Sequence, residues 1–259
     1  MEYVSHDGRR TAYRIAQSDG AGPTLLYVHG SGGNHRIWAA QYGPRGPAHP
    51  AAALDLSGHG ESDDIDTPVG SETLRAYADD VCAVADAVDA DVLVGNSLGG
   101  AVVQRILVER DHGLSGAVLA GSGAKLAVHD ALREVLADDF GAAIDVLHDE
   151  DMLFHDTHDR MVAQSRETMR AVGRAVTERD FLSCHSFDVR DRLSDIDVPV
   201  LALVGEYDQL TPVSYHEYLA DEIPDGRLAV LEDAAHLAMV EQPTGFASAI
   251  ETFLDELAV

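Results

Sequence analysis

Short apolar runs alternate with helical patterns along most of the chain. The apolar runs have the length of β-strands and few polar residues, as strands buried on both faces of a sheet do. They lie at residues 24–28, 51–56, 91–94, 117–120, 198–204 and 227–231. Helical patterns lie between them, at residues 71–88, 98–109, 212–221 and 243–257. The alternation predicts an α/β fold with a mostly parallel central sheet and helices on both faces.

Two helix starts carry local signals. Ser71 precedes Glu72 at the start of a helical pattern, and a serine in that place predicts an N-cap. Pro212 stands where another helix begins, and proline is well suited to the first turn.

The stretch from residue 123 to residue 195 breaks the alternation, because it shows no clear strand. It contains helical patterns at 130–137 and 162–176. Ligands of open α/β sheets bind at the carboxyl ends of the strands, and inserted helices would cover that edge. We therefore expect a core made of residues 1–122 and 196–259 and a helical cap made of residues 123–195.

The pattern Gly95-Asn96-Ser97-Leu98-Gly99-Gly100 lies between a predicted strand and a predicted helix. A nucleophilic serine must stand on a sharp strand-to-helix turn, with its hydroxyl clear of the sheet. That turn is crowded, so the residues two before and two after the serine must be small. Gly95 and Gly99 meet this condition, and Ser97 is the candidate nucleophile.

A serine hydroxyl needs a base, and the base needs an acid that orients it. His236 follows the last predicted strand, and Asp208 follows the strand before it. Both positions lie at carboxyl ends of strands, so the side chains can reach the same crevice as Ser97. The chain order serine, acid, histidine is the one this type of fold uses. Glu206 is the competing acid.

Two backbone N–H groups are needed to bind the oxyanion that forms during acyl transfer. Leu98, directly after the nucleophile, should supply one of them. Ser31 should supply the other, from the glycine-rich loop that follows the first central strand. Glycines such as Gly30 let this backbone approach a substrate closely.

Together these pieces resemble the α/β-hydrolase superfamily over nearly the whole chain. The resemblance rests on residues 29–33, Asp55 with residues 58–62, the Ser97 elbow, residues 205–212, and His236 followed by residues 241–243. It implies a parallel sheet with a helical cap, no cofactor and a serine acyl-enzyme. Catalysis by Ser97, Asp208 and His236 follows, with no metal ion.

Within that superfamily the chain is similar to small esterases, enol-lactonases and the carbon–carbon hydrolases of aromatic-ring degradation. Asn96 matches the last group, which usually has tryptophan where Leu237 stands here. Gly30, Asn96 and Leu237 are the expected substrate contacts. The carbon–carbon hydrolases also use a cap arginine, and the candidates here are Arg166, Arg170, Arg174 and Arg179.

The leading hypothesis is a serine hydrolase of small carboxylic esters. A carbon–carbon hydrolase or an enol-lactonase with the same triad is the alternative, and acyl transfer to an acceptor other than water stays open. A ligand-binding receptor without turnover is disfavoured, because all three triad residues are present in order. The substrate partner is a small acyl compound whose identity the sequence leaves open.

Several other polar residues have structural interpretations. A metal site at residues 155–159 is disfavoured, because His155 and His158 lack a defined set of partner ligands. His29 and His59 are expected to shape the loops of the crevice, and Trp38 to pack a helix onto the sheet. The acidic run at residues 63–66 is expected to be solvated.

The charge is strongly acidic, with 45 Asp and Glu against 18 Lys and Arg and a net charge of −27. Such a surface repels phosphate backbones and anionic lipids, which argues against nucleic-acid and membrane partners. Lys125 is the only lysine. In about 1 M salt the Debye length shrinks to about 3 Å, and most of the internal repulsion is screened. The composition therefore favours a protein adapted to a salt-rich cytoplasm.

Cys82 and Cys184 are the only cysteines, so no disulfide framework is expected. Whether the two pair stays open, although a reducing compartment is the simpler interpretation. No apolar run approaches the roughly 18 residues of a membrane span, and the first residues lack a signal-peptide pattern. A cytoplasmic location is the expectation, and the oligomeric state is open.

Overall fold

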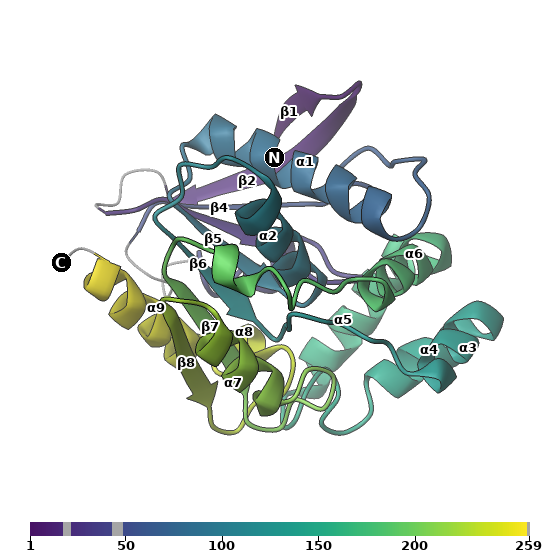
Figure 1. Ribbon diagram of the computed structural model, residues 1–259. Helices are drawn as coiled ribbons and strands as arrows, with labels where there is room; N and C mark the ends of the chain where they lie inside the picture. The colour runs from purple at the N-terminus through teal and green to yellow at the C-terminus, as the bar shows by residue number, and fades with distance from the viewer. Residues whose placement is uncertain (18–21, 43–48, 258–259) are drawn as a thin grey trace.

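A computed structural model describes residues 1–17, 22–42 and 49–257. Its core is an eight-stranded sheet in the order β1-β2-β4-β3-β5-β6-β7-β8, parallel from β4 to β8 (Figure 1). The six parallel strands are β3 (Leu25–Val28), β4 (Ala51–Leu54), β5 (Val92–Asn96), β6 (Gly116–Ala120), β7 (Val200–Gly205) and β8 (Gly226–Leu231). Each overlaps a predicted apolar run, which confirms the α/β class.

Both faces of the sheet are covered by helices. Alternate residues of a strand point to opposite faces, so Leu26 and Val28 of β3 belong to one core cluster and Leu25 and Tyr27 to the other. The first cluster is covered by α1 (Ser71–Val88), α2 (Leu98–Glu109) and α7 (Val213–Glu222). The second is covered by the short helix η1 (His35–Trp38), α8 (Ala238–Glu241) and α9 (Pro243–Leu257).

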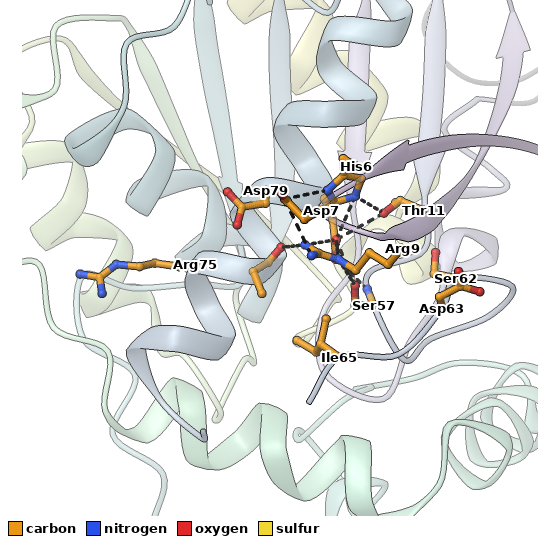
Figure 2. A network of polar contacts seen from close by, with 12 residues as sticks. His6, Asp7, Arg9, Thr11, Ser57, Ser62, Asp63, Ile65, Arg75 and Asp79 are labelled. Atoms are coloured by element: carbon orange, nitrogen blue, oxygen red, sulfur yellow. Dashed lines mark hydrogen bonds and ion pairs between the residues drawn. The ribbon is translucent and has the colours of Figure 1, made fainter. Parts of the chain in front are cut away.

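An antiparallel hairpin that was not predicted lies at the amino end, formed by β1 (Glu2–His6) and β2 (Arg9–Gln17). A fully buried carboxylate on α1, Asp80, anchors it. Asp80 Oδ1 accepts from Arg9 Nε at 2.9 Å, and Asp80 Oδ2 accepts from the Ser57 amide at 2.8 Å. Figure 2 shows His6, Arg9, Thr11 and Ser57 drawn together in this network. The network therefore ties the hairpin and α1 to the loop that follows β4.

Four α-helices and a short 3-10 helix, η2 (Leu193–Asp195), lie between β6 and β7. The segment that contains them, residues 123–195, is called the helical insertion below. The four α-helices are α3 (Asp130–Asp138), α4 (Phe140–Leu147), α5 (Asp159–Val172) and α6 (Arg174–His185). Figure 1 shows them grouped on one side of the sheet. This fully described segment adds no strand to the sheet. The helical pattern predicted at 162–176 is two helices, because Gly173 between them has φ +87° and ends the first.

The two predicted helix starts are each displaced by one position. Gly70, with φ +107°, occupies the N-cap of α1, and Ser71 is the first helical residue. The Ser71 hydroxyl instead accepts from Arg105 Nη2 at 2.8 Å. Pro212 is the N-cap of α7 rather than part of its first turn.

The acidic run at residues 63–66 is more structured than predicted. Asp63 forms an ion pair with Arg10 at 3.1 Å, and Asp64 forms one with Arg179 of α6 at 2.8 Å. These exposed pairs connect the loop after β4 to the hairpin and to the helical insertion. None of the described helices is long and apolar enough to cross a membrane.

We expect Phe246→Ala to destabilise the fold, because Phe246 of α9 is fully buried beside Trp38, with ring centroids 5.9 Å apart. Trp38 in turn packs on Tyr27 of β3, as predicted for a residue that joins a helix to the sheet. The substitution should cost about 3–5 kcal/mol of unfolding free energy, measured by urea unfolding. Tyr218→Ala, at an exposed position of α7, is the control and should cost about 0.5 kcal/mol or less. Equal losses would contradict the packing assigned to α9.

Candidate active site

Ser97 stands on the sharp turn between β5 and α2. Its φ of +54° is unusual for a residue with a side chain. A Cβ atom on Gly99 would come within 2.4 Å of the Val28 carbonyl oxygen, and one on Gly95 within 2.5 Å of the Gly99 carbonyl oxygen. Only glycines therefore allow α2 to pack this close to the sheet, and Ser97 is held at the amino end of α2.

The structure brings Asp208 and His236 together from the loops after β7 and β8. His236 Nδ1 donates to Asp208 Oδ2 at 2.9 Å, and both residues are buried. This bond leaves His236 Nε2 as the nitrogen that can accept a proton. Ser97 and His236 line the same cavity, without a described hydrogen bond between them, and such bonds often tighten only when substrate binds. Glu206, the competing acid, is exposed and has no described bond to His236.

Asp208 is held as a carboxylate by its neighbours. Burial raises its pKa, but the adjacent His236 and the hydrogen bonds from Thr211 outweigh burial, so the pKa lies below its ordinary value. Asp208 Oδ1 accepts from the amides of Leu210 and Thr211, and Oδ2 accepts from the Thr211 hydroxyl at 2.7 Å. The sequence analysis assigned no role to Thr211, whose hydroxyl fixes the carboxylate that faces His236.

The loop in front of His236 is fixed by Glu241 of α8. Its carboxylate accepts from the amides of Ala235, His155 and Asp156, at 2.7, 2.8 and 3.1 Å. Burial raises the pKa of Glu241 above its ordinary value.

His155 and its surroundings hold no group of three metal-ligating side chains, and neither does any other described part of the chain.

The oxyanion loop, defined as residues 29–33, follows β3. The Gly33 amide donates to the Gly30 carbonyl at 3.2 Å, and the Gly32 amide donates to Asp180 Oδ2 at 3.4 Å. The amides of Ser31 and Leu98 have no hydrogen-bond acceptor among the described residues. Those are the two N–H groups that the sequence analysis assigned to the oxyanion, and they remain free to bind one.

Three buried histidines support these loops. His29 accepts from the Leu56 amide at Nε2 and donates to the Gly30 carbonyl at Nδ1, so it is neutral. Burial lowers its pKa to about 4. His59 forms an ion pair with Asp180 at 2.9 Å. His29 and His59 thus have the structural roles that were predicted for them. His216 of α7, which the sequence analysis missed, accepts from the Ser122 amide at 2.9 Å, and burial lowers its pKa to about 4.

A cavity of about 560 Å³ opens beside Ser97 between the sheet edge and the helical insertion. Gly30, Asn96 and Leu237, the expected substrate contacts, all line it. Asn96 Nδ2 donates to the Ala120 and His236 carbonyls, which holds its amide in place. Much of the insertion wall is apolar and includes Leu132, Leu153, Phe154, Met161 and Met169.

The four insertion arginines considered for substrate binding do not line this cavity. Arg166 pairs with Asp145, Arg174 with Glu178 and Arg179 with Asp64. Both cysteines are free, and Cys184 lines the cavity while Cys82 is half-buried on α1.

A serine elbow and a histidine–carboxylate pair at the carboxyl edge of one parallel sheet are typical of serine hydrolases. The chain belongs to the alpha/beta hydrolase family, whose family model matches residues 25–249. The match spans the sheet from β3 onward, the helical insertion and the first half of α9.

Individual relatives match over nearly their whole length. The chain is 29% identical to a pimeloyl-[acyl-carrier protein] methyl ester esterase of Neisseria meningitidis, over 95% of this chain and 98% of that protein. It is 23% identical to 3-oxoadipate enol-lactonase 1 of Acinetobacter baylyi, over 98% of this chain and 96% of that protein. A solved structure of an N-acyl homoserine lactone degrading enzyme superimposes on this protein with a TM-score of 0.85. The two chains are 26% identical, and the match covers 97% of this chain and 100% of the other.

The two buried neutral histidines predict a loss of stability in mild acid. His29 and His216 have pKa values lowered to about 4, whereas a histidine in the unfolded chain titrates near 6.5. As the pH falls from about 6.5 to about 4, the unfolded chain binds protons that the folded chain does not. The free energy of unfolding therefore falls over that interval.

His216→Gln tests this, because a glutamine can still accept from the Ser122 amide and does not titrate. The stability advantage of the wild type over this variant should shrink by on the order of 2 kcal/mol between pH 6.5 and pH 4. Urea unfolding at a series of pH values measures it. The exposed His158→Gln variant is the control and should follow the wild type throughout. A constant difference for His216→Gln would show that His216 does not stay neutral.

Proposed function

We propose that this protein hydrolyses small carboxylic esters through an acyl-enzyme on Ser97. The observation that carries the proposal is the buried 2.9 Å bond between His236 Nδ1 and Asp208 Oδ2 beside the cavity that Ser97 lines. The esterase names of several relatives support the substrate class.

The first half of the reaction forms the acyl-enzyme. Ser97 Oγ attacks the carbonyl carbon while His236 Nε2 takes the hydroxyl proton. Asp208 stabilises the imidazolium through its bond to Nδ1, and the amides of Ser31 and Leu98 bind the oxyanion. When the tetrahedral intermediate collapses, the bond to the alcohol oxygen breaks, and His236 gives that oxygen its proton.

The second half removes the acyl group. Water attacks the acyl carbonyl carbon as His236 Nε2 takes one of its protons. The same two amides bind the second oxyanion. Collapse breaks the bond to Ser97 Oγ, which regains its proton from His236, and the carboxylic acid leaves.

We propose further that the helical insertion, residues 123–195, acts as a cap on a core made of residues 1–122 and 196–259. Its apolar side chains face the cavity together with Leu237, so the acyl group is expected to be apolar. The cavity volume of about 560 Å³ suits a small ester.

Lactone hydrolysis is the second candidate, because one relative is named an enol-lactonase and one similar structure an N-acyl homoserine lactone degrading enzyme. A lactone is a cyclic ester, so the same attack by Ser97 opens the ring, and the alcohol stays attached to the product. Carbon–carbon cleavage has less support, since Leu237 stands where those enzymes have tryptophan and no insertion arginine lines the cavity.

We also propose that the protein works in a salt-rich cytoplasm. The net charge of −27 and the near absence of lysine support salt adaptation. The two free cysteines are compatible with a reducing compartment.

The first test is a chain-length series of nitrophenyl esters, with small lactones alongside. Turnover should peak at short acyl chains, and Ser97→Ala should abolish it. Asp208→Asn should lower kcat by roughly 10³- to 10⁴-fold, because it disturbs the histidine tautomer. Glu206→Gln is the matched control and should keep wild-type activity, since Glu206 has no described contact with His236. Turnover that survives in Ser97→Ala would refute the mechanism. A folded protein that turns over no ester or lactone would favour a binding role.

Salt dependence is the second test. Raising KCl from about 0.1 M to about 1 M shortens the Debye length from about 10 Å to about 3 Å. The repulsion among surface carboxylates should then weaken, so the urea midpoint and the ester turnover should both rise. NaCl at the same ionic strength should reproduce the rise, because screening depends on ionic strength and not on the identity of the cation. A urea midpoint that stays constant or falls with KCl would contradict salt adaptation.

A further inference from the structure

We propose that Asp180 of α6 is the positioning residue of the oxyanion loop and acts through an ion pair with His59. The proposal rests on the proposed function, because the loop matters only if the Ser31 amide binds an oxyanion. It assigns to the helical insertion a part in the chemistry besides shaping the cavity.

Asp180 joins three separate parts of the chain at one fully buried carboxylate. Its Oδ2 accepts from His59 Nε2 at 2.9 Å and from the Gly32 amide at 3.4 Å. Its Oδ1 accepts from the Tyr77 hydroxyl of α1 at 2.7 Å. A buried carboxylate is unfavourable unless it is paired and hydrogen-bonded, and these three donors satisfy it.

The contacts of His59 indicate an imidazolium. Its Nδ1 lies 3.2 Å from the Ser57 carbonyl oxygen, which can only accept, so Nδ1 carries a proton. Its Nε2 faces the Asp180 carboxylate, which also accepts, so Nε2 carries a proton as well. Burial lowers the pKa of His59, but the charge and hydrogen bond of Asp180 outweigh burial and raise it. The pair is therefore a positive ring held against a negative carboxylate inside the protein.

The pair controls which amides of the oxyanion loop stay free. Gly32, with φ +66°, turns its amide toward Asp180, and Gly33 turns its amide toward Gly30. The Ser31 amide between Gly30 and Gly32 is then left without an acceptor among the described residues. If Asp180 did not hold the Gly32 amide, the peptide plane next to Ser31 could rotate, and the oxyanion donor would lose its direction.

Helices α5 and α6 of the insertion also lie next to the oxyanion loop at two further residues. Cys184, one turn further along α6, lines the cavity together with Ser31. A Cβ atom on Gly32 would come within 3.0 Å of Met169 Cγ on α5. The loop is thus packed between the sheet and the helical insertion, with Asp180 as its charged anchor.

Asp64 supplies a matched control for the experiment. It forms a second ion pair between α6 and the core, with Arg179 at 2.8 Å. Asp64→Asn removes one carboxylate and one contact of α6, as Asp180→Asn does, but Asp64 itself contacts neither His59 nor the oxyanion loop. Arg179 keeps its other bonds, to the Tyr77 hydroxyl and to the Ile65 and Ser57 carbonyls. If Asp180 contributed to stability alone, Asp180→Asn and Asp64→Asn would differ in their unfolding free energies and would both keep the wild-type activity.

Two activities are measured on both variants. The first is hydrolysis of the best nitrophenyl ester, separated into kcat and KM. The second is the rate at which a fluorophosphonate probe labels Ser97, which needs the same oxyanion donors and no knowledge of the natural substrate. Asp180→Asn should lower kcat and the maximal labelling rate by roughly tenfold to a hundredfold, with KM changed by about twofold or less. Asp64→Asn should leave both rates at the wild-type level.

Tyr77→Phe keeps the test open if Asp180→Asn fails to fold. It removes the hydroxyl that donates to Asp180 Oδ1 and keeps the ring. It should lower kcat and the labelling rate in the same sense but by less, roughly threefold to tenfold, without a change in KM.

Three outcomes overturn the proposal. Asp180→Asn or Tyr77→Phe could raise KM and leave kcat unchanged, which would place the effect in substrate binding. Folded Asp180→Asn could keep the wild-type labelling rate, or Asp64→Asn could lower it equally. Failure of the proposed function looks different, because Ser97 of the wild type would then resist the probe and no ester would be turned over.

Discussion

The contact between Gly99 and the Val28 carbonyl oxygen sets the geometry on which the rest of the site depends. A side chain at Gly99 would overlap that oxygen, so α2 can lie against β3 only with hydrogen in its place. The close approach forces the chain to turn within one residue at the end of β5, and Ser97 takes the positive φ of that turn. It also brings the free amide of Leu98 and the amino end of α2 to the place where negative charge would develop. The positions of the proposed nucleophile and of one proposed oxyanion donor thus follow from a single steric constraint.

Each buried titratable group around this elbow has partners that favour one protonation state. His29 and His216 each accept from a backbone amide and are kept neutral by burial. His59 faces a carboxylate on one side and a carbonyl oxygen on the other, and so is kept positive. Asp208 receives donors on both oxygens and stays ionised. Neighbouring groups with opposite protonation preferences can coexist in one buried region only because each has its own fixed partners.

Much of this was predictable from the sequence, and each failure has its own physical reason. The parallel strands are mostly apolar and the Ser97 elbow is a local pattern, so both can be recognised without knowing what they contact. Asp208 and His236 follow apolar strands, and the carboxyl ends of those strands must meet at one edge. Asp180 and His216 lie inside helices, and their partners are distant in the chain, so no local signal marks them. The amino-terminal hairpin was missed although Asp7 and Gly8, both with positive φ, form its turn. Its strands are partly exposed and lack the continuous apolar runs that mark the parallel strands. The division at Gly173 was missed because a single glycine does not by itself end a helical pattern.

The two ends of the helical insertion run side by side where they leave the sheet. Lys125 and Asp188 form an antiparallel bridge, and the Val189 amide donates to the Ala124 carbonyl at 2.9 Å. The segment therefore enters and leaves the sheet through one narrow stalk, so it can be lengthened, shortened or replaced during evolution without disturbing strand order. Such modularity would let relatives diversify substrate choice by exchanging one contiguous stretch of gene. Asp180 limits that freedom, because a transplanted segment would also have to present a carboxylate to His59. Recombination between relatives is then expected to preserve that pair even where the surrounding sequence diverges.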